Sequence, residues 1–195
     1  MEKILLLGDS IRFGLLSKKE IRGYGPIVAE KLAGKAEVFA PDDNCRFAEY
    51  TLRYLRDWMK KLHPEEITVI HWNNGLWDAL RLDGDEPLTP IPFYAHYLVR
   101  IYRALRRFCP DARIIFATST PVDESRANPN FTRRNEEIRA YNDAAVETLL
   151  PLGVEINDLY SVAEEFPPEL HADFVHFTEE GSRLLADAVI RALNL

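Results

Sequence analysis

The sequence predicts an α/β protein in which a parallel sheet is covered by helices on both faces. Short apolar runs alternate with longer amphipathic segments along the chain, which is the pattern of βαβ units. The apolar runs are continuous rather than alternating, as expected for strands that are buried on both faces. The 195 residues are 47% hydrophobic and 28% charged, which is typical of a chain that buries one sizeable core. We therefore expect a single domain over residues 1–195, built as a three-layer α/β/α sandwich.

Five apolar runs are predicted to form the strands. Gly8 and Asp9 close the first run, and Pro41 with the polar residues after it closes the second. A helical segment separates each run from the next, so all the strands are expected to be parallel. The predicted strands cover residues 3–7, 37–40, 67–72, 113–118 and 154–156.

Helical periodicity follows each predicted strand. The first helix is expected at residues 25–33, with Pro26 in its first turn. A last helix is expected after Thr178, which would cap it, with two glutamates in its first turn. Between them, apolar side chains recur at helical spacing over residues 52–62, 91–108 and 138–149. The longest predicted loops are 83–90 and 119–130.

Composition excludes several classes of function. The formal net charge is −7, and the basic pairs 106–107 and 133–134 are interpreted as solvated helix faces, which argues against binding of nucleic acid or an anionic membrane. Cys45 and Cys109 form neither a disulfide framework nor a metal-ligand pattern, so no metal and no cofactor is expected. The apolar runs are too short for a transmembrane helix or a signal peptide. We expect a cytoplasmic protein that acts on a small molecule; the sequence does not indicate its oligomeric state.

Ser10 lies where the first predicted strand ends, in the segment Gly8-Asp9-Ser10. Parallel sheets place their sites beyond the carboxyl ends of the strands. A serine at that position can expose its hydroxyl to a substrate, and nearby backbone N–H groups can stabilise an oxyanion. The same dipeptide is common in turns, so Ser10 could also be a simple cap.

A serine nucleophile needs a histidine base that is oriented by an acid. Asp173 and His176 stand three residues apart just before the last helix. At that spacing the carboxylate can reach one imidazole nitrogen while the other faces the serine. His171 is a rival base because it is close in sequence, and His71 is another because it lies near the end of a central strand.

Amide side chains follow the second and third predicted strands and are candidate oxyanion donors. Asn44 follows the second strand, and Asn73 and Asn74 follow the third. A sequence such as Asn74-Gly75 is also a strong turn signal, so these amides could be structural instead.

Two arginines and two tryptophans are candidate substrate-binding residues. Arg12 and Arg46 flank the serine and Asn44, and they could hold a carboxylate or phosphate of the substrate or pair with acids in the loops. Trp72 and Trp77 could stack on a sugar ring or belong to the core.

The order of these segments resembles the SGNH hydrolase superfamily, also called GDSL-type esterases and lipases. Gly-Asp-Ser ends the first strand, asparagine loops follow the next two, and Asp-x-x-His precedes the last helix, so the resemblance spans residues 8–176. It implies a flavodoxin-like SGNH hydrolase fold with a five-stranded parallel sheet. It also implies that Ser10 is the nucleophile, Asp173 the acid and His176 the base of an ester hydrolase that forms an acyl-enzyme.

Two segments depart from the family pattern. The family reads Gly-x-Asn-Asp after the third strand, whereas this chain has Trp77 in place of that asparagine. The family's glycine after the second strand is missing, and Cys45 stands beside Asn44 instead. The oxyanion hole is therefore expected to combine the Ser10 N–H with the amides of Asn44, Asn73 and Asn74.

The expected substrate is a small acyl ester, with an O-acetylated carbohydrate or similar metabolite as the best candidate. Lysophospholipids and thioesters are alternatives that the resemblance also allows. A different alternative is a catalytically weakened domain that binds a glycan or an acylated metabolite, because the oxyanion segments are altered.

Overall fold

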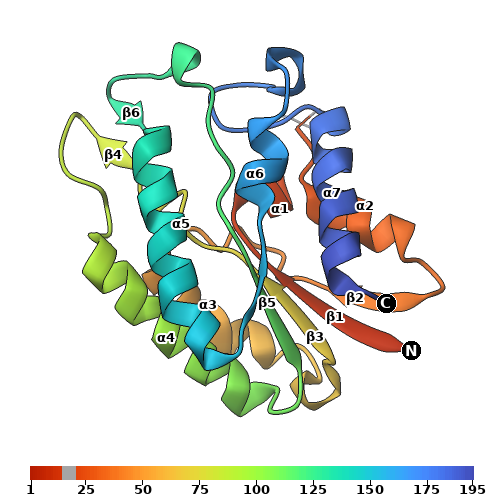
Figure 1. Ribbon diagram of the computed structural model, residues 1–195. Helices are drawn as coiled ribbons and strands as arrows, with labels where there is room; N and C mark the ends of the chain where they lie inside the picture. The colour runs from red at the N-terminus through yellow and green to blue at the C-terminus, as the bar shows by residue number, and fades with distance from the viewer. Residues whose placement is uncertain (15–20) are drawn as a thin grey trace.

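The computed structural model describes residues 1–14 and 21–195 and has the predicted α/β architecture (Figure 1). All neighbouring strands of its main sheet pair in parallel, in the order β2-β1-β3-β5-β7. The strands are β1 (Glu2–Leu7), β2 (Ala36–Phe39), β3 (Val69–Trp72), β5 (Arg113–Ala117) and β7 (Glu155–Asn157). The prediction of a five-stranded parallel sheet is thereby confirmed.

Helices cover both faces of this sheet (Figure 1). On one face α2 packs against α7, and α6 also contacts α7. On the other face α4 packs between α3 and α5. The helices are α2 (Tyr24–Lys31), α3 (Ala48–Met59), α4 (Ile91–Phe108), α5 (Asn135–Leu149), α6 (Leu159–Glu164) and α7 (Glu179–Leu193).

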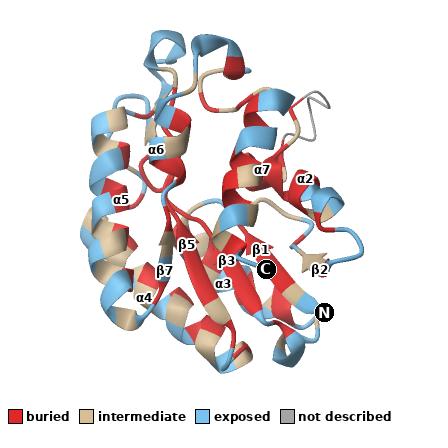
Figure 2. Ribbon diagram, turned by 45° about the vertical axis from the view of Figure 1, so that its right-hand side comes forward, coloured by how far each residue is buried: buried red, intermediate tan, exposed pale blue. Residues whose placement is uncertain are grey.

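The central strands are the most deeply buried part of the molecule (Figure 2). Residues 4–7 of β1 are fully buried, as the continuous apolar run predicts, whereas the edge strand β2 is only partly covered. The register pairs Leu7 with Trp72 and Trp72 with Phe116. Because these three residues are level, the loops that follow β1, β3 and β5 emerge side by side at one edge of the sheet.

Several short elements lie outside the predicted set. Helix α1 (Ser10–Phe13) directly follows β1, and β4 (Arg81–Leu82) pairs antiparallel with β6 (Phe131–Thr132). Elements of two to four residues are too short to show a periodic pattern. The described residues also form 3₁₀ turns at Pro64–Glu66, Glu124–Arg126, Leu150–Leu152 and Pro168–Leu170.

The described residues provide neither a membrane-spanning helix nor a cluster of metal ligands. Over residues 1–14 and 21–195 no helix combines the length and apolar character needed to cross a membrane. In the same part of the chain no group of His, Cys, Asp and Glu side chains is arranged to hold a metal ion. Cys45 and Cys109 are both free and buried.

Candidate active site

Ser10 is the first residue of α1, at the carboxyl end of β1. Asp9 caps this helix, because its Oδ1 accepts a hydrogen bond from the Ile11 N–H at 2.9 Å. The single helical turn rotates Ser10 out of the strand direction. As the first helical residue, Ser10 has an N–H with no acceptor inside the helix, so this group is available to an oxyanion.

Asp173, His176 and Ser10 form a continuous hydrogen-bonded chain. The His176 Nε2 atom lies 2.8 Å from Ser10 Oγ. The other ring nitrogen, Nδ1, lies 2.9 and 3.0 Å from the two carboxylate oxygens of Asp173. This is the connectivity that a nucleophile, a base and an orienting acid require.

The electrostatics of Asp173 define the role of the histidine. Burial acts to raise the pKa of Asp173, but hydrogen bonds from the His176 ring and from the N–H groups of His176 and Val175 outweigh it and hold that pKa well below its usual range. An ionised Asp173 can only accept, so His176 Nδ1 donates to it. Nε2 is then left to accept a hydrogen bond from the Ser10 hydroxyl.

The two rival histidines occupy other environments. His171 packs its ring against Phe177, with centroids 4.9 Å apart. His71 is fully buried on β3, where its Nε2 accepts a hydrogen bond from Asn157 at 3.0 Å, and burial lowers the pKa of His71 to about 3. The structure therefore pairs the serine with His176 rather than with either rival.

Arg12 is a structural residue, which corrects the prediction that it binds substrate. It is 3% exposed, and its guanidinium donates to the carbonyl oxygens of Gly8, Pro41 and Asp43 at 3.2, 3.2 and 2.6 Å. These bonds tie α1 to the loop after β2. Arg12 thus fixes the segment that carries Asn44 in place relative to Ser10.

Asn74 and Trp72 also support the fold rather than a ligand. Both are fully buried. The Asn74 amide donates to Arg46 O and Thr51 Oγ1, each at 2.9 Å, and its oxygen accepts from Trp72 Nε1 at 2.7 Å. Trp72 packs edge-on against Phe116. Because both amide hydrogens are committed, Asn74 does not serve as an oxyanion donor, and Trp72 offers no surface to a substrate.

Two of the three predicted amides keep a hydrogen for a ligand. Asn73 Nδ2 donates to Ala117 O at 2.9 Å, and its only other acceptor among the described residues is Ser119 Oγ, at a weak 3.5 Å. Asn44 Oδ1 accepts from the Arg46 N–H at 2.9 Å, and the structure gives its Nδ2 no acceptor in the described part of the chain. The Cys45 N–H, in contrast, donates to Gly8 O.

Arg46 and Trp77 both remain accessible. Arg46 is exposed and lies over the ring of Tyr50, 4.7 Å from its centroid. Trp77 is half-buried and meets Phe131 edge-on, with Arg133 5.9 Å from the Trp77 ring centroid. Trp77 and Phe131 of β6 thus pack against each other, and part of the Trp77 side chain stays exposed.

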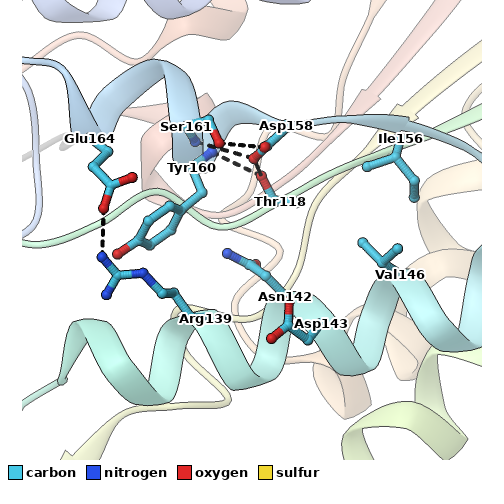
Figure 3. A pocket seen from close by; sticks show the side chains of 10 residues that line it. All are labelled: Thr118, Arg139, Asn142, Asp143, Val146, Ile156, Asp158, Tyr160, Ser161 and Glu164. Carbon is cyan, nitrogen blue, oxygen red and sulfur yellow. Dashed lines mark hydrogen bonds and ion pairs between the residues drawn. The ribbon is translucent and has the colours of Figure 1, made fainter.

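One cavity lies apart from the hydrogen-bonded chain of Asp173, His176 and Ser10. It holds about 450 Å³ between α5 and α6, beyond the ends of β5 and β7 (Figure 3). An ion pair between Arg139 and Glu164 spans it at 2.5 Å. Of the described residues that line it, none belongs to the triad; they are Thr118, Arg139, Asn142, Asp143, Val146, Ile156, Asp158, Tyr160, Ser161 and Glu164. A narrower cavity shares Thr118 with it and is lined by Ile11, Asn73 and Leu76.

Sequence comparison identifies the family. The model of the GDSL-like lipase/acylhydrolase family matches residues 6–184, which include every member of the hydrogen-bonded chain. The chain belongs to this family. It is therefore an ester hydrolase of the GDSL type, as the resemblance implies.

Relatives of this GDSL hydrolase occur in plants. GDSL esterase/lipase CPRD49 from Arabidopsis thaliana is 24% identical, and the match covers 88% of this chain and 72% of the relative. GDSL esterase/lipase WDL1 from Oryza sativa subsp. japonica is 21% identical, with 88% and 71% covered.

Solved structures share the fold of this GDSL hydrolase. The lipase/acylhydrolase from Enterococcus faecalis superimposes with a TM-score of 0.77 at 22% identity, covering 99% of this chain and 95% of that one. The acetyl xylan esterase AlAXEase superimposes with a TM-score of 0.74 at 17% identity, covering 98% and 99%.

Asp78 makes the stability of this GDSL hydrolase depend on pH. It is fully buried and accepts from the Ala48 N–H at 3.0 and 3.2 Å, which caps α3. Burial raises the pKa of Asp78 from 3.8 to about 7. The folded state therefore holds the Asp78 proton more tightly than the unfolded chain does, so the contribution of Asp78 to stability is fully present below about pH 4 and is lost as pH rises to about 7.

Asp78→Asn is expected to flatten this profile, because asparagine keeps an acceptor for Ala48 but does not titrate. In the wild-type protein, Asp78 is expected to lower the free energy of unfolding by up to about 4 kcal/mol between pH 4 and 7, and the variant should lack this decrease. Urea unfolding at several pH values measures it. Equal slopes in the two proteins would contradict the assignment.

Proposed function

We propose that this GDSL hydrolase cleaves a small acyl ester through a covalent acyl-enzyme on Ser10. The observation that carries the proposal is the unbroken chain from Asp173 through His176 to Ser10, with 2.8 Å between His176 Nε2 and Ser10 Oγ. Hydrogen-bond contact between base and nucleophile is the geometry that activates a serine hydroxyl.

In the proposed reaction, Ser10 Oγ attacks the ester carbonyl as His176 Nε2 takes its proton. The N–H of Ser10 and the amides of Asn73 and Asn44 donate to the oxyanion that forms. The bond to the alcohol then breaks, and His176 returns the proton to the leaving oxygen. Water attacks the acyl-enzyme with His176 again as base, which releases the acid and regenerates Ser10.

An O-acetylated carbohydrate is the proposed substrate class. Three observations support it: the partly exposed Trp77 provides an aromatic wall, the exposed Arg46 provides a polar donor, and a structural neighbour is an acetyl xylan esterase. Lysophospholipids and thioesters remain the alternatives that the family allows. The cytoplasmic location expected from the two thiols stays a prediction.

A fluorophosphonate probe tests the proposed nucleophile without a substrate. We expect a covalent adduct on Ser10, located by peptide mass spectrometry, because an activated serine attacks phosphorus as it attacks a carbonyl. In His176→Ala the adduct should disappear. A wild-type protein that stays unlabelled and inactive on acetyl esters, but binds sugars saturably, would instead be a weakened glycan-binding domain.

A further inference from the structure

Arg133 is a buried cation, which corrects the interpretation of the pair 133–134 as a solvated face. Arg133 is 3% exposed, and its Nε donates to the carbonyl oxygen of Leu76. Its guanidinium lies 5.3 Å from the ring centroid of Phe131 and 5.9 Å from that of Trp77. Its Nη1 is also buried and has no hydrogen-bond partner among the described residues. A buried cation with an unused donor is costly unless an opposite charge is near.

Asp9 is a buried carboxyl group near the same place in the fold. It is 1% exposed and directly precedes Ser10. Only one of its oxygens is used, since Oδ1 accepts from the Ile11 N–H while Oδ2 is buried and has no partner in the described part of the chain. An ionised Asp9 therefore needs a positive charge nearby, just as Arg133 needs a negative one.

The fold brings these two charges to the same edge of the sheet. Leu76, which Arg133 binds, follows β3, and β3 is paired with β1 up to Leu7. Leu76 and Ile11 line the same narrow cavity. Arg133 is thereby held beside the turn that carries the nucleophile.

Other charges do not take the place of Arg133. Burial raises the pKa of Asp9, and of the cations that oppose this effect Arg133 acts most strongly, ahead of His176 and Arg12. The guanidinium of Arg12 is already committed to backbone carbonyls. His176 is engaged by Asp173 and Ser10.

We propose that Arg133 is a positioning residue for the nucleophile: its charge balances the buried carboxylate of Asp9, and Asp9 in turn holds the first turn of α1. The N–H and Oγ of Ser10 then face the oxyanion and His176 in fixed directions. The catalytic part of this inference rests on the proposed function, whereas the charge balance can be tested without turnover.

A double-mutant cycle tests the charge balance through stability. Arg133→Met removes the cation, and Asp9→Asn removes the anion but keeps a good helix cap. Without Arg133 the pKa of Asp9 rises further, so the variant should lose more stability at pH 8 than at pH 5. In the Asp9→Asn background the same change should cost much less and show no extra loss at pH 8.

Urea midpoints of the four proteins at both pH values give the result. Other charged or titratable groups act on Asp9 too, but they are common to all four proteins and cancel in the cycle; they are His176, Arg12, Asp78, Tyr24 and Tyr94. If the loss of stability in Arg133→Met is independent of pH and additive with that of Asp9→Asn, Arg133 contributes through packing alone, and the proposal is overturned. If Arg133→Met does not fold, folding of the double variant supports the proposal and its failure to fold overturns it.

Kinetics test the positioning itself. Arg133→Met is expected to lower kcat by about tenfold or more at pH 7 with little change in KM, because Arg133 acts through Asp9 and not on the substrate. Arg133→Lys, which keeps the charge, should recover most of the loss. A rise in KM at unchanged kcat would show that Arg133 contacts substrate and would overturn the role. Absence of turnover in the wild-type protein would refute the proposed function. The double-mutant cycle would then still test whether Arg133 balances the charge of Asp9.

Discussion

His176→Ala is expected to reduce kcat for ester hydrolysis by about 10⁴-fold or more, whereas His171→Ala should leave it close to the wild-type value. His176 is the residue whose Nε2 lies 2.8 Å from Ser10 Oγ and whose Nδ1 is held by Asp173. Without it the serine keeps its proton and is a weak nucleophile. His171 instead packs against Phe177, so its loss removes an aromatic contact rather than a base.

Hydrolysis of an activated acetyl ester by the two purified variants measures this difference. His171→Ala is the matched control, because it lies five residues before His176 in the same loop region and removes the same side chain. Urea unfolding of both variants establishes that the folded enzymes are compared. Equal and large losses of kcat in two folded variants would contradict the assignment of His176 as the base.

The main elements of the fold were predictable from the sequence because buried parallel strands and amphipathic helices have distinct patterns. The helix at residues 91–108 was predicted with the observed bounds, since its apolar stripe runs over its full length. The short helices α1 and α6 and the β4–β6 pair were not predicted. Their residues are set by the loops they close rather than by any local periodicity.

The site was predictable where its chemistry depends on spacing within one loop. Asp173 and His176 are three residues apart, and the loop itself brings the carboxylate to Nδ1. Asn142 shows a contact between a helix and a loop, since its amide bonds the backbone of Ser119. In contrast, the direction of a side chain at the end of a strand depends on tertiary neighbours. Arg12 turns inward because unpaired carbonyls of the loop after β2 lie beneath it.

The adjacent residues Asn73 and Asn74 illustrate the same limit. They have the same chemistry, and the sequence gives no reason to separate them. In the structure Asn74 points into the core and satisfies Trp72, Arg46 and Thr51, while Asn73 points toward the loop after β5. The two successive side chains face different neighbours, so the hydrogen bonds of the fold consume the amide of Asn74 and leave a hydrogen of Asn73 for the site.

Asn73→Ala is therefore expected to lower kcat by about 10²–10³-fold with little change in KM, since the loss of one oxyanion donor has this size. Asn73 keeps one amide hydrogen, for which Ser119 Oγ, 3.5 Å away, is the only competing acceptor in the described part of the chain. Asn44→Ala should lower kcat as well, by a smaller factor, because Asn44 is more exposed and its hydrogen bond to an oxyanion is more strongly screened by water. Steady-state kinetics on an acetyl ester measures both effects.

Asn142→Ala is the control for Asn73→Ala, because it removes a hydrogen-bonded contact with the loop after β5 without removing a proposed oxyanion donor. Asn73 and Asn142 both hydrogen-bond the chain where β5 ends, at Ala117 and Ser119 respectively, and so brace that segment. Removing Asn142 should therefore destabilise the protein while kcat of the folded fraction falls much less than in Asn73→Ala. If the two variants lose kcat equally, Asn73 acts by bracing that segment, and the oxyanion would be held by the Ser10 N–H with Asn44 alone.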